Sequence, residues 1–479
     1  MEKRSRAAFS PRKSTVCFSR EGSSARGARA FSAAMGLSAA AQPHFQTRDA
    51  EHRAMVLGAE ERLREYRRML PGGDLAQKLD GRFWDAVVLT AANDRQAETY
   101  VAQLDALHKR GQLPGTRGMY LVIPDPPGPR VGSGGATLHV MLKLQAIAGT
   151  GWSEKRLFLL HAGGYSERSP AHGTLGKAFG QLPLDAANLG VPATILEAQL
   201  LSFQELPKKL PPGVFISSAD IAVQFGKLPR LDFSTDEFKS CERGILALGH
   251  ASSVEIGTGH GVFVCDREEL NTFAKSSGGG DGNNGVVGKS TDDGTQQTNT
   301  KKPVSVLTAR RCLQKPSKSL MRSSGAVLPS PRAMGHTGGS SDEWVLTDSA
   351  FHIGAGACQA LTKVAAENPA VFSGVEICAY GDFMQPMGCD ADSAYTGRTD
   401  QVASLNAHTE DKTKASKLRE ARILLSNVLR SRPLLALPLV PSRFVHVGTM
   451  PELLQHCVRD DDVLAAFPTT PSGIGLGTW

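Results

Sequence analysis

A glycine-rich segment is the strongest candidate for binding a phosphate. It follows the short apolar run Leu121–Ile123 and begins a stretch with helical spacing. Glycine permits tight turns and lets backbone N–H groups approach a phosphate closely, and the helix N-terminus behind them favours negative charge. The segment matches neither a Walker A loop nor G-x-G-x-x-G, and a plain tight turn explains such glycines nearly as often. The predicted nucleotide-binding residues are Gly132, Ser133, Gly134, Gly135, Ala136 and Thr137.

A cationic segment follows the apolar run Arg156–His161. It passes through a Gly-Gly pair to Ser166 and Arg168, and Lys177 comes shortly after. Ligands commonly bind at the carboxyl ends of strands in α/β sheets, which is where this segment is expected. A guanidinium suits a phosphate and an ammonium is a compact cation, although an isolated cation is usually a solvated surface charge. We predict Arg168 and Lys177 as catalytic residues and Ser166 as a further ligand contact on the same loop.

Two aspartates each follow a predicted strand, Asp220 after Val214–Ser217 and Asp382 after Val375–Tyr380. Their carboxylates could share one Mg²⁺, which binds one or two carboxylates together with substrate phosphates. Each aspartate alone would more often be a helix cap or a turn residue, and spacing by itself does not show that the two meet. We predict Mg²⁺ as the cofactor, with Asp220 and Asp382 as its ligands and Asp220 also as a catalytic residue.

His260 is another candidate ligand contact. It precedes the predicted strand Val262–Cys265 in a Gly-His-Gly sequence, and the alternative is a structural turn histidine. The chain has no Ser-His-Asp arrangement, no H-E-x-x-H motif and no kinase signature. Its eight cysteines show neither a C-x-x-C pair nor zinc spacing, so a reduced intracellular setting is expected.

The elements that must position these residues are short apolar runs alternating with helical patterns. Runs rich in Val, Ile, Leu and Phe are typical of buried strands, and their alternation with helices predicts βαβ units. We therefore expect an α/β fold with an open, mostly parallel sheet covered on both faces. The predicted strands are Ala86–Thr90, Met119–Ile123, Arg156–His161, Val214–Ser217, Ile245–Leu248, Val262–Cys265, Val375–Tyr380 and Phe444–Val447. Helices are predicted around Ala97–Leu107 and Leu138–Leu144 and at Ala355–Ala366 and Lys417–Leu429.

The formal charge of +7 does not point to a nucleic-acid partner. Nine basic residues lie within the first 48 residues, opposed by two glutamates, and no basic stripe interleaved with aromatic residues follows. No apolar run is long enough to span a bilayer, so no membrane partner is expected. The first 48 residues have the composition of a transit peptide, but a disordered extension, or a start at Met35 or Met55, explains them equally well. A cytoplasmic location is expected, with organelle targeting by this segment as the alternative.

Composition divides the chain into three parts. Residues 1–60 are predicted to be a disordered or targeting extension, 61–458 the folded domain, and 459–479 a tail. Within the domain, residues 275–302 and about 316–341 are polar and bury little, so both are predicted to be disordered surface insertions.

At these motifs the sequence resembles the fucose-1-phosphate guanylyltransferase (GDP-fucose pyrophosphorylase) family, from about Leu63 to about Val458. Fucokinases carry a similar region, together with a sugar-kinase domain for which this chain has no motifs. Many collinear matches are more specific than any one of them. The matching stretches are Phe83–Ala92, Arg130–Thr137, Leu160–Arg168, Gly176-Lys177, Ser218–Asp220, Gly257–Phe263, Thr347–Ser349, Tyr380–Phe383 and Phe444–Gly448.

The resemblance implies a Rossmann-like nucleotidyltransferase domain that binds GTP and L-fucose 1-phosphate and forms GDP-L-fucose and pyrophosphate. It also implies a C-terminal left-handed β-helix, which we expect to be absent or truncated because the chain reaches Trp479 without hexapeptide-like repeats. Guanine and fucose selection come from the resemblance alone, and the resemblance makes Ser166 and His260 the predicted sugar-phosphate contacts. The alternatives are the same chemistry on another sugar 1-phosphate or nucleotide, and a non-catalytic module that binds a nucleotide sugar.

Overall fold

The structure is a computed structural model that describes residues 42–164, 166, 168–228, 231, 236–277, 305–328, 343–398 and 412–459. The chain divides into two compact units, Met1–Thr47 and Arg48–Trp479. The sheet and all the predicted site residues belong to the second unit. The predicted tail 459–479, apart from residue 459, and residues 278–302 of the first insertion lie outside the described residues.

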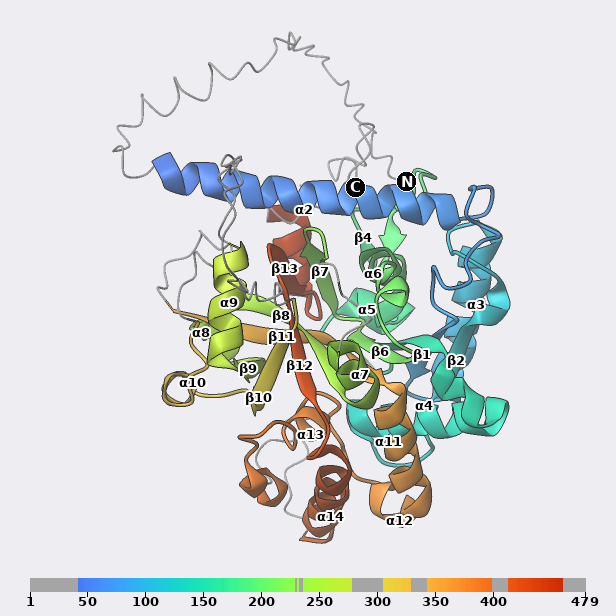
Figure 1. The fold of residues 1–479 in the computed structure, drawn as a ribbon. Helices are drawn as coiled ribbons and strands as arrows, with labels where there is room; N and C mark the ends of the chain where they lie inside the picture. The colour runs from blue at the N-terminus through green and yellow to red at the C-terminus, as the bar shows by residue number, and fades with distance from the viewer. Residues whose placement is uncertain are drawn as a thin grey trace, which may run out of the picture. The chain divides into compact units, whose positions relative to one another are not determined.

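Four parallel strands form one half of the main sheet (Figure 1). β1 (Ala86–Ala91) pairs with β2 (Tyr120–Pro124) and β3 (Arg156–His161), and β6 (Gly213–Ser218) pairs with β3. Because all four strands run in the same direction, their carboxyl ends lie at one edge, which we call the carboxyl edge. The four strands predicted from these segments are confirmed, and the glycine-rich, Gly-Gly and Asp220 segments all follow this edge.

The rest of the sheet is mixed. β11 (Trp344–Gly354) runs antiparallel to both β6 and β8 (Ile245–Ser253), and β12 (Leu434–Leu439) is parallel to β8. β10 (Leu307–Gln314) is antiparallel to β12 and to β9 (Gly261–Cys265), which pairs back to β11. Strands β11, β8, β12, β10 and β9 are therefore paired in a closed cycle. The prediction of an open, mostly parallel sheet is correct for the first four strands and wrong for these five.

Both faces of the parallel half are buried. Along β3, Phe158 and Leu160 join one apolar cluster and Leu157 and Leu159 join the other, as the two-residue period of a strand requires. Helices cover each face, which confirms the mixed α/β class. The first cluster includes residues of α3 (Asp94–Lys109) and α6 (Ile195–Phe203); the second includes residues of α4 (Gly132–Ala148), α11 (Ala355–Glu367) and α14 (Lys412–Leu429).

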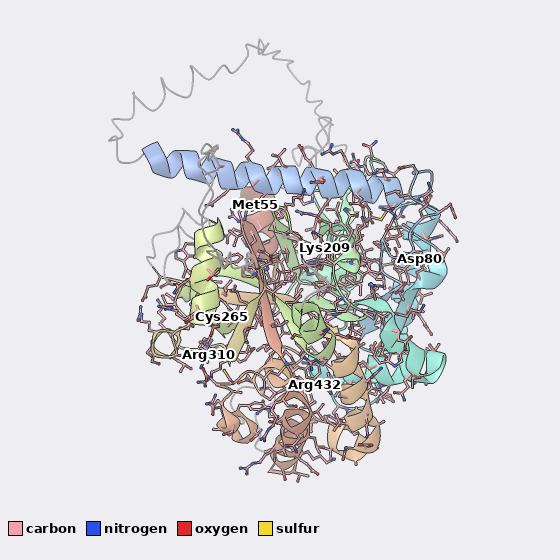
Figure 2. All side chains as sticks on the ribbon, viewed as in Figure 1. Met55, Asp80, Lys209, Cys265, Arg310 and Arg432 are labelled. Carbon is pink, nitrogen blue, oxygen red and sulfur yellow. The ribbon has the colours of Figure 1, made fainter. Side chains whose placement is uncertain are left out.

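The folded part of the chain begins before residue 61, because helix α2 spans Gln42–Met69. Arg62 is buried, donates hydrogen bonds to the carbonyls of Phe225 and Gly226, and stacks over the Phe225 ring at 4.1 Å. Met55, labelled in Figure 2, is another buried side chain of this helix. The predicted boundary at residue 60 is wrong, because the apolar residues of α2 are too sparse to show a clear pattern in the sequence.

The second polar stretch is also partly folded. Residues 316–328, which the sequence places in an insertion, include α10 (Lys318–Ser323) with its buried Met321, whereas 329–341 lie outside the described residues. None of the helices among the described residues has the length and apolar character needed to cross a membrane. The remaining elements are β4 (Gln181–Leu182), β5 (Ala193–Thr194), β7 (Ile221–Phe225), β13 (Ser442–His446), α5 (Pro170–Leu175), α7 (Asp236–Arg243), α8 (Val254–Gly257), α9 (Arg267–Ser277), α12 (Pro369–Phe372), α13 (Gly381–Met384) and α15 (Met450–Leu454).

A buried histidine on β11 makes the fold sensitive to acid. His352 is 2% exposed, and neither ring nitrogen has a hydrogen-bond partner among the described residues. Burial, with a smaller contribution from Arg156, lowers the pKa of His352 to about 3. Below about pH 6.5 the imidazole of His352 is protonated in the unfolded chain but stays neutral in the folded chain. This difference destabilises the fold as the pH falls from about 6.5 toward 3.

The variant His352→Leu is expected to reduce this acid sensitivity. The loss of unfolding free energy between pH 7 and pH 4.5, measured with denaturant, should be smaller in the variant by up to about 3 kcal/mol. The buried carboxyl of Asp348 works in the opposite direction, because burial raises its pKa to about 6. The comparison is therefore between variant and wild type at both pH values, and equal losses in the two proteins would contradict the prediction.

Candidate active site

The glycine-rich segment forms the first turn of α4, directly after the loop that follows β2. Gly132 has a φ of 71°, and a Cβ there would lie 2.4 Å from the carbonyl oxygen of Ile377. The N–H of Gly134 donates to that carbonyl at 2.7 Å, and Ser133 Oγ accepts from the N–H of Ala379 at 3.0 Å. The glycines therefore have a packing role against the segment 377–379, and part of the first turn is already bonded within the protein.

The segment Val375–Tyr380 is not the strand that the sequence predicts. It is an irregular stretch that runs beside the start of α4 and leads into α13, and its backbone bonds to the glycine-rich segment rather than to the sheet. Its buried apolar residues, Val375, Ile377 and Ala379, alternate as in a strand, which explains the wrong prediction.

A hydrogen bond connects the glycine-rich segment to β3. Thr137 Oγ1 lies 2.9 Å from Nε2 of His161, the last residue of β3. Burial lowers the pKa of His161 to about 4, with opposite smaller contributions from Asp220 and Lys177. A neutral imidazole thus lies between the helix that begins at the glycine-rich segment and the charged residues described below.

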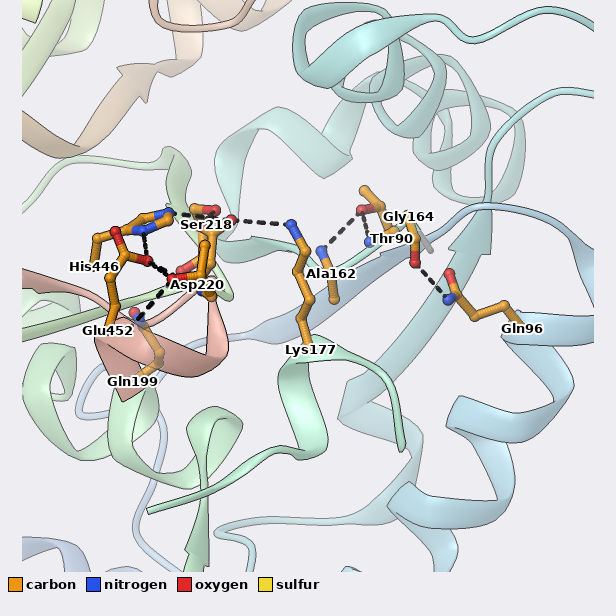
Figure 3. Close-up of polar contacts among 12 residues, drawn as sticks. Thr90, Gln96, Ala162, Gly164, Lys177, Gln199, Ser218, Asp220, His446 and Glu452 are labelled. Carbon is orange, nitrogen blue, oxygen red and sulfur yellow. Dashed lines mark hydrogen bonds and ion pairs between the residues drawn. The ribbon is translucent and has the colours of Figure 1, made fainter. Parts of the chain in front are cut away.

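The Gly-Gly segment after β3 is held by two side chains of the β1 region (Figure 3). Thr90 Oγ1 accepts hydrogen bonds from the N–H groups of Ala162 and Gly163, and Gln96 Nε2 donates to the carbonyl of Gly164 at 2.9 Å. A Cβ on Gly163 would lie 3.1 Å from the backbone of Ala91, so a glycine allows this close approach. These contacts fix the start of the loop that leads to Arg168 and Lys177.

Lys177 and Asp220 form an ion pair at the carboxyl edge. Lys177 Nζ lies 2.9 Å from Asp220 Oδ2, and both side chains are mostly buried, at 21% and 16% exposure. Lys177 begins a short 3₁₀ turn after Gly176, where a Cβ would lie 2.2 Å from the ring of Tyr100, so the close approach to that ring requires glycine. Asp220 occupies the turn between β6 and β7. The structure thus brings together two of the three predicted catalytic residues.

His446 and Glu452 extend this cluster, as Figure 3 shows. β13 pairs antiparallel with β7 so that His446 is opposite Ile221, and His446 Nε2 lies 3.8 Å from Asp220 Oδ2. The other ring nitrogen of His446 lies 2.7 Å from Glu452 Oε2. Glu452 belongs to the capping box that begins α15, so the imidazole is held between a fixed carboxylate and Asp220.

The partners of Asp220 keep it ionised. Burial alone would raise the pKa of Asp220, but the imidazole of His446 at 3.8 Å, the charge of Lys177 and the hydrogen bond from Ser218 outweigh burial and hold that pKa well below its usual range. The nearby carboxylate of Asp220 raises the pKa of His446. The site therefore holds an ionised carboxylate between the cation of Lys177 and the imidazole of His446.

Arg168 and Ser166 lie on the loop between these parts. The Arg168 side chain is exposed, and its carbonyl accepts a hydrogen bond from the N–H of Met450 at 3.2 Å, which ties the loop to the start of α15. Ser166 has a φ of 53°, and its buried hydroxyl has no hydrogen-bond partner among the described residues. Both residues keep their predicted roles as proposals.

His260 lies close to this cluster through Phe444 of β13. The two rings meet edge to face with centroids 5.1 Å apart, and the charge of His446, after burial itself, lowers the pKa of His260. The structure thus brings a residue predicted from the turn before β9 to the same part of the molecule as Asp220. Its predicted contact with a sugar phosphate stays a prediction.

Asp382 has a different position from the one expected for a metal ligand. It is 1% exposed, its Oδ1 accepts from Arg422 Nε at 2.8 Å, and its Oδ2 accepts from the N–H of Cys378 at 2.7 Å. Asp382 thus lies in the first turn of α13 and binds Arg422, a buried arginine of α14. Because its side chain is only 2% exposed and paired with Arg422, we expect Asp382 to stabilise the fold rather than to share a metal with Asp220.

A substitution at Asp382 distinguishes a role in stability from a role in metal binding. Asp382→Asn is expected to lower the free energy of unfolding by about 3–5 kcal/mol, because it leaves the guanidinium of Arg422 buried without its countercharge. Denaturant unfolding measures the loss. The Mg²⁺ concentration that gives half-maximal activity should not change, and a large increase in it would restore Asp382 as a metal ligand.

The chemistry of Asp220 fits Mg²⁺. Among the described residues, no three His, Cys, Asp or Glu side chains are grouped so that they could hold a metal by themselves. An ionised carboxylate that supplies one protein ligand beside substrate phosphates is the usual arrangement for this ion. Asp220 is ionised and would suit this role, and the cation of Lys177 lies beside it.

Three residues of the site were not found from spacing: His446, Glu452 and Asp348. Asp348 lies on β11 close to the level at which β6 ends, and its Oδ1 accepts from the N–H of Gly261 at 3.0 Å. His446 and Asp348 lie in stretches that match the family, but no motif of known chemistry marked them. The pairing of β13 with β7 and of β11 with β6 brings them to the site, and neither pairing is visible in the sequence.

Residues 149–473, more than half of the chain, match the family model described as "Fucose pyrophosphorylase domain". The chain is 32% identical over 415 residues to fucose-1-phosphate guanylyltransferase of Mus musculus, covering 82% of this chain and 61% of that protein. It is 30% identical over 394 residues to fucose-1-phosphate guanylyltransferase of Homo sapiens, covering 80% and 56%. The chain thus spans about three fifths of the length of these curated relatives.

Two further likenesses are weaker. The bifunctional fucokinase/GDP-fucose pyrophosphorylase of Arabidopsis thaliana is 30% identical over 210 residues, covering 39% of this chain and 19% of that protein. A solved structure of UDP-glucose pyrophosphorylase complexed with UDP-glucose aligns over 80% of this chain and 97% of its own, at 9% identity and a TM-score of 0.22. A TM-score this low carries no argument about the fold.

Proposed function

The chain belongs to the fucose pyrophosphorylase family, and we propose that it transfers GMP from GTP to L-fucose 1-phosphate. A phosphate oxygen of the sugar phosphate attacks the α-phosphorus of GTP, and the bond to the bridging oxygen of the β-phosphate breaks. The products are GDP-L-fucose and pyrophosphate. The choice of GTP and of fucose is supported by the names of the relatives, both fucose-1-phosphate guanylyltransferases.

The observation that carries the proposal is the Lys177–Asp220 ion pair at the carboxyl edge of the parallel strands. Both reactants are anions, so the protein must hold two mutually repelling groups in line and neutralise the charge that develops. The nucleophile is already ionised and needs no strong base. A fixed cation and a fixed carboxylate with a very low pKa fit this task better than they fit proton transfer.

Each charged residue of the site has its own role in this proposal. Lys177 contacts the α-phosphate of GTP, Arg168 neutralises a phosphate from its exposed position on the loop, and the first turn of α4 lies behind the nucleotide phosphates. Asp220 holds Lys177 in place and would be the protein ligand of Mg²⁺, which supplies charge neutralisation of the phosphate oxygens when bound. His446 and Glu452 fix the carboxylate from the other side.

The test is pyrophosphate release from the purified full chain with Mg²⁺, GTP and L-fucose 1-phosphate. ATP and UTP replace GTP, and mannose 1-phosphate and glucose 1-phosphate replace the sugar, as comparators. Release confined to GTP with fucose 1-phosphate is the expected result. Release with another pair keeps the chemistry but changes the substrate, and a folded protein that binds nucleotide without any release contradicts the proposal.

A further inference from the structure

The ends of strands β9 and β10 and a carboxylate of β11 meet around one glycine, Gly261. Gly261 begins β9, its register partner on β10 is Gln314, and its N–H donates to Asp348 Oδ1 at 3.0 Å. A Cβ on Gly261 would lie 2.4 Å from Asp348 Oδ2, so the carboxylate occupies space that only glycine leaves open. Strands β9, β10 and β11 therefore place Gln314 and the carboxylate of Asp348 next to the same glycine.

The segment before α13 supplies a third polar group. A Cβ on Gly381 would lie 3.5 Å from Gln314 Cγ, so the backbone beside Tyr380 approaches the Gln314 side chain closely. The Tyr380 ring packs edge to face on Phe351 of β11, with centroids 5.1 Å apart. Burial raises the pKa of Tyr380, followed by the charges of Asp348 and then Asp220, so its hydroxyl is a proton donor within electrostatic reach of both carboxylates.

Two of these groups are buried and lack partners. The Tyr380 hydroxyl and Gln314 Oε1 have no hydrogen-bond partner among the described residues, although both atoms are shielded from solvent. A buried polar group left unbonded costs about 1–3 kcal/mol, and most such groups in folded proteins are satisfied. One unbonded donor and one unbonded acceptor close to a buried carboxylate indicate a polar ligand that completes them.

The charge of this region selects the kind of ligand. Asp348 is 6% exposed, and with Asp220 it makes this part of the site unfavourable for a phosphate. A hydroxyl group, in contrast, both donates and accepts, so a pair of neighbouring hydroxyls can donate to Gln314 and Asp348 and accept from Tyr380. The region therefore suits the uncharged sugar ring, while the cation of Lys177 suits the phosphates.

We propose that Tyr380, Gln314 and Asp348 form a subsite that binds two neighbouring hydroxyl groups of the sugar ring of the sugar 1-phosphate. The proposal rests on the proposed function, since it assigns the sugar end of that reaction. It names specificity-determining residues in addition to the sugar-phosphate contacts expected at Ser166 and His260.

The experiment removes one hydrogen-bonding group at a time, first from the protein and then from the sugar. Tyr380→Phe deletes one oxygen and keeps the ring, and we expect KM for L-fucose 1-phosphate to rise about tenfold, as the loss of one hydrogen bond implies. KM for GTP should change less than twofold. Tyr120→Phe is the matched control, because its buried hydroxyl donates to the carbonyl of Pro114, so only stability should fall. Gln314→Leu should repeat the effect of Tyr380→Phe.

Deoxy analogues of L-fucose 1-phosphate, lacking the hydroxyl at position 2, 3 or 4, locate the contact. Wild type should bind two of them, deoxy at adjacent positions, about tenfold more weakly, and Tyr380→Phe should show no further loss with the analogue that lacks its partner hydroxyl, since that hydrogen bond is already gone. Calorimetric titration with the sugar phosphate gives affinity without requiring turnover.

The outcomes separate the two proposals. Suppose that wild type is active, that Tyr380→Phe and Gln314→Leu keep the wild-type KM for the sugar phosphate, and that the losses are additive for every analogue. The subsite proposal is then wrong and the proposed function stands. Wild type that binds fucose 1-phosphate without turnover, with weakened binding in Tyr380→Phe, supports the subsite and overturns the activity. Wild type that binds no sugar 1-phosphate overturns both.

Discussion

Replacing Lys177 by alanine is expected to lower the rate of pyrophosphate release by about 100- to 1,000-fold, the range seen when one charge-stabilising group is removed from an active site. Lys177 is the mostly buried cation that faces Asp220 at the carboxyl edge, and no solvent cation would be held as firmly in its place. The loss should fall on kcat, because the interaction strengthens as charge develops at the α-phosphate.

The control for Lys177→Ala is Lys208→Ala. Lys208 also forms a half-buried ion pair, with Glu65 of α2, and has no predicted role in the site. Both variants lose a cation and an ion pair, so thermal unfolding should shift by similar amounts, whereas only Lys177→Ala should lose activity. A mild loss of activity in Lys177→Ala, within about fivefold of the Lys208 variant, would move the charge-neutralising role to another residue, with Arg168 as the first candidate.

Replacing Asp220 by asparagine is expected to reduce the rate at least as much. The substitution keeps the size of the side chain but leaves Lys177 and His446 facing a neutral amide, so both side chains lose the charge that positions them. It also removes the proposed protein ligand of Mg²⁺. The Mg²⁺ concentration for half-maximal activity should therefore rise by at least about tenfold.

A Mg²⁺ titration separates the two effects of Asp220→Asn. Asp105→Asn is the matched control, since Asp105 pairs with Arg117 on the surface of the parallel half and should leave the titration unchanged. If excess Mg²⁺ restores activity, the carboxylate acts mainly through the metal. If activity stays low at every Mg²⁺ concentration and the half-maximal value does not move, Asp220 positions Lys177 and is not a metal ligand.

The parallel half of the fold was predictable because its information is local. β1, β2, β3 and β6 are short apolar runs, buried on both faces, and each is separated from the next by a helix with its own apolar spacing. β11 and β10 escaped prediction because polar residues such as Asp348 and Arg310 interrupt them. The segment Val375–Tyr380 was wrongly predicted as a strand, because the apolar alternation that looked like a sheet face instead packs against the start of α4.

Local sequence is enough to identify the glycine-rich segment, Lys177 and Asp220, because a glycine, a cation or a carboxylate that follows a short strand can be recognised from the residues around it. Which of these charges meet depends on how the chain folds. Lys177 and Asp220 are 43 residues apart, and Asp220 and His446 are farther still. Strand pairing joins the last two, and helix packing removed Asp382 from the group by giving it Arg422. The partner of each buried charge depends on which distant residues the fold brings near it, and a single stretch of sequence does not show those residues.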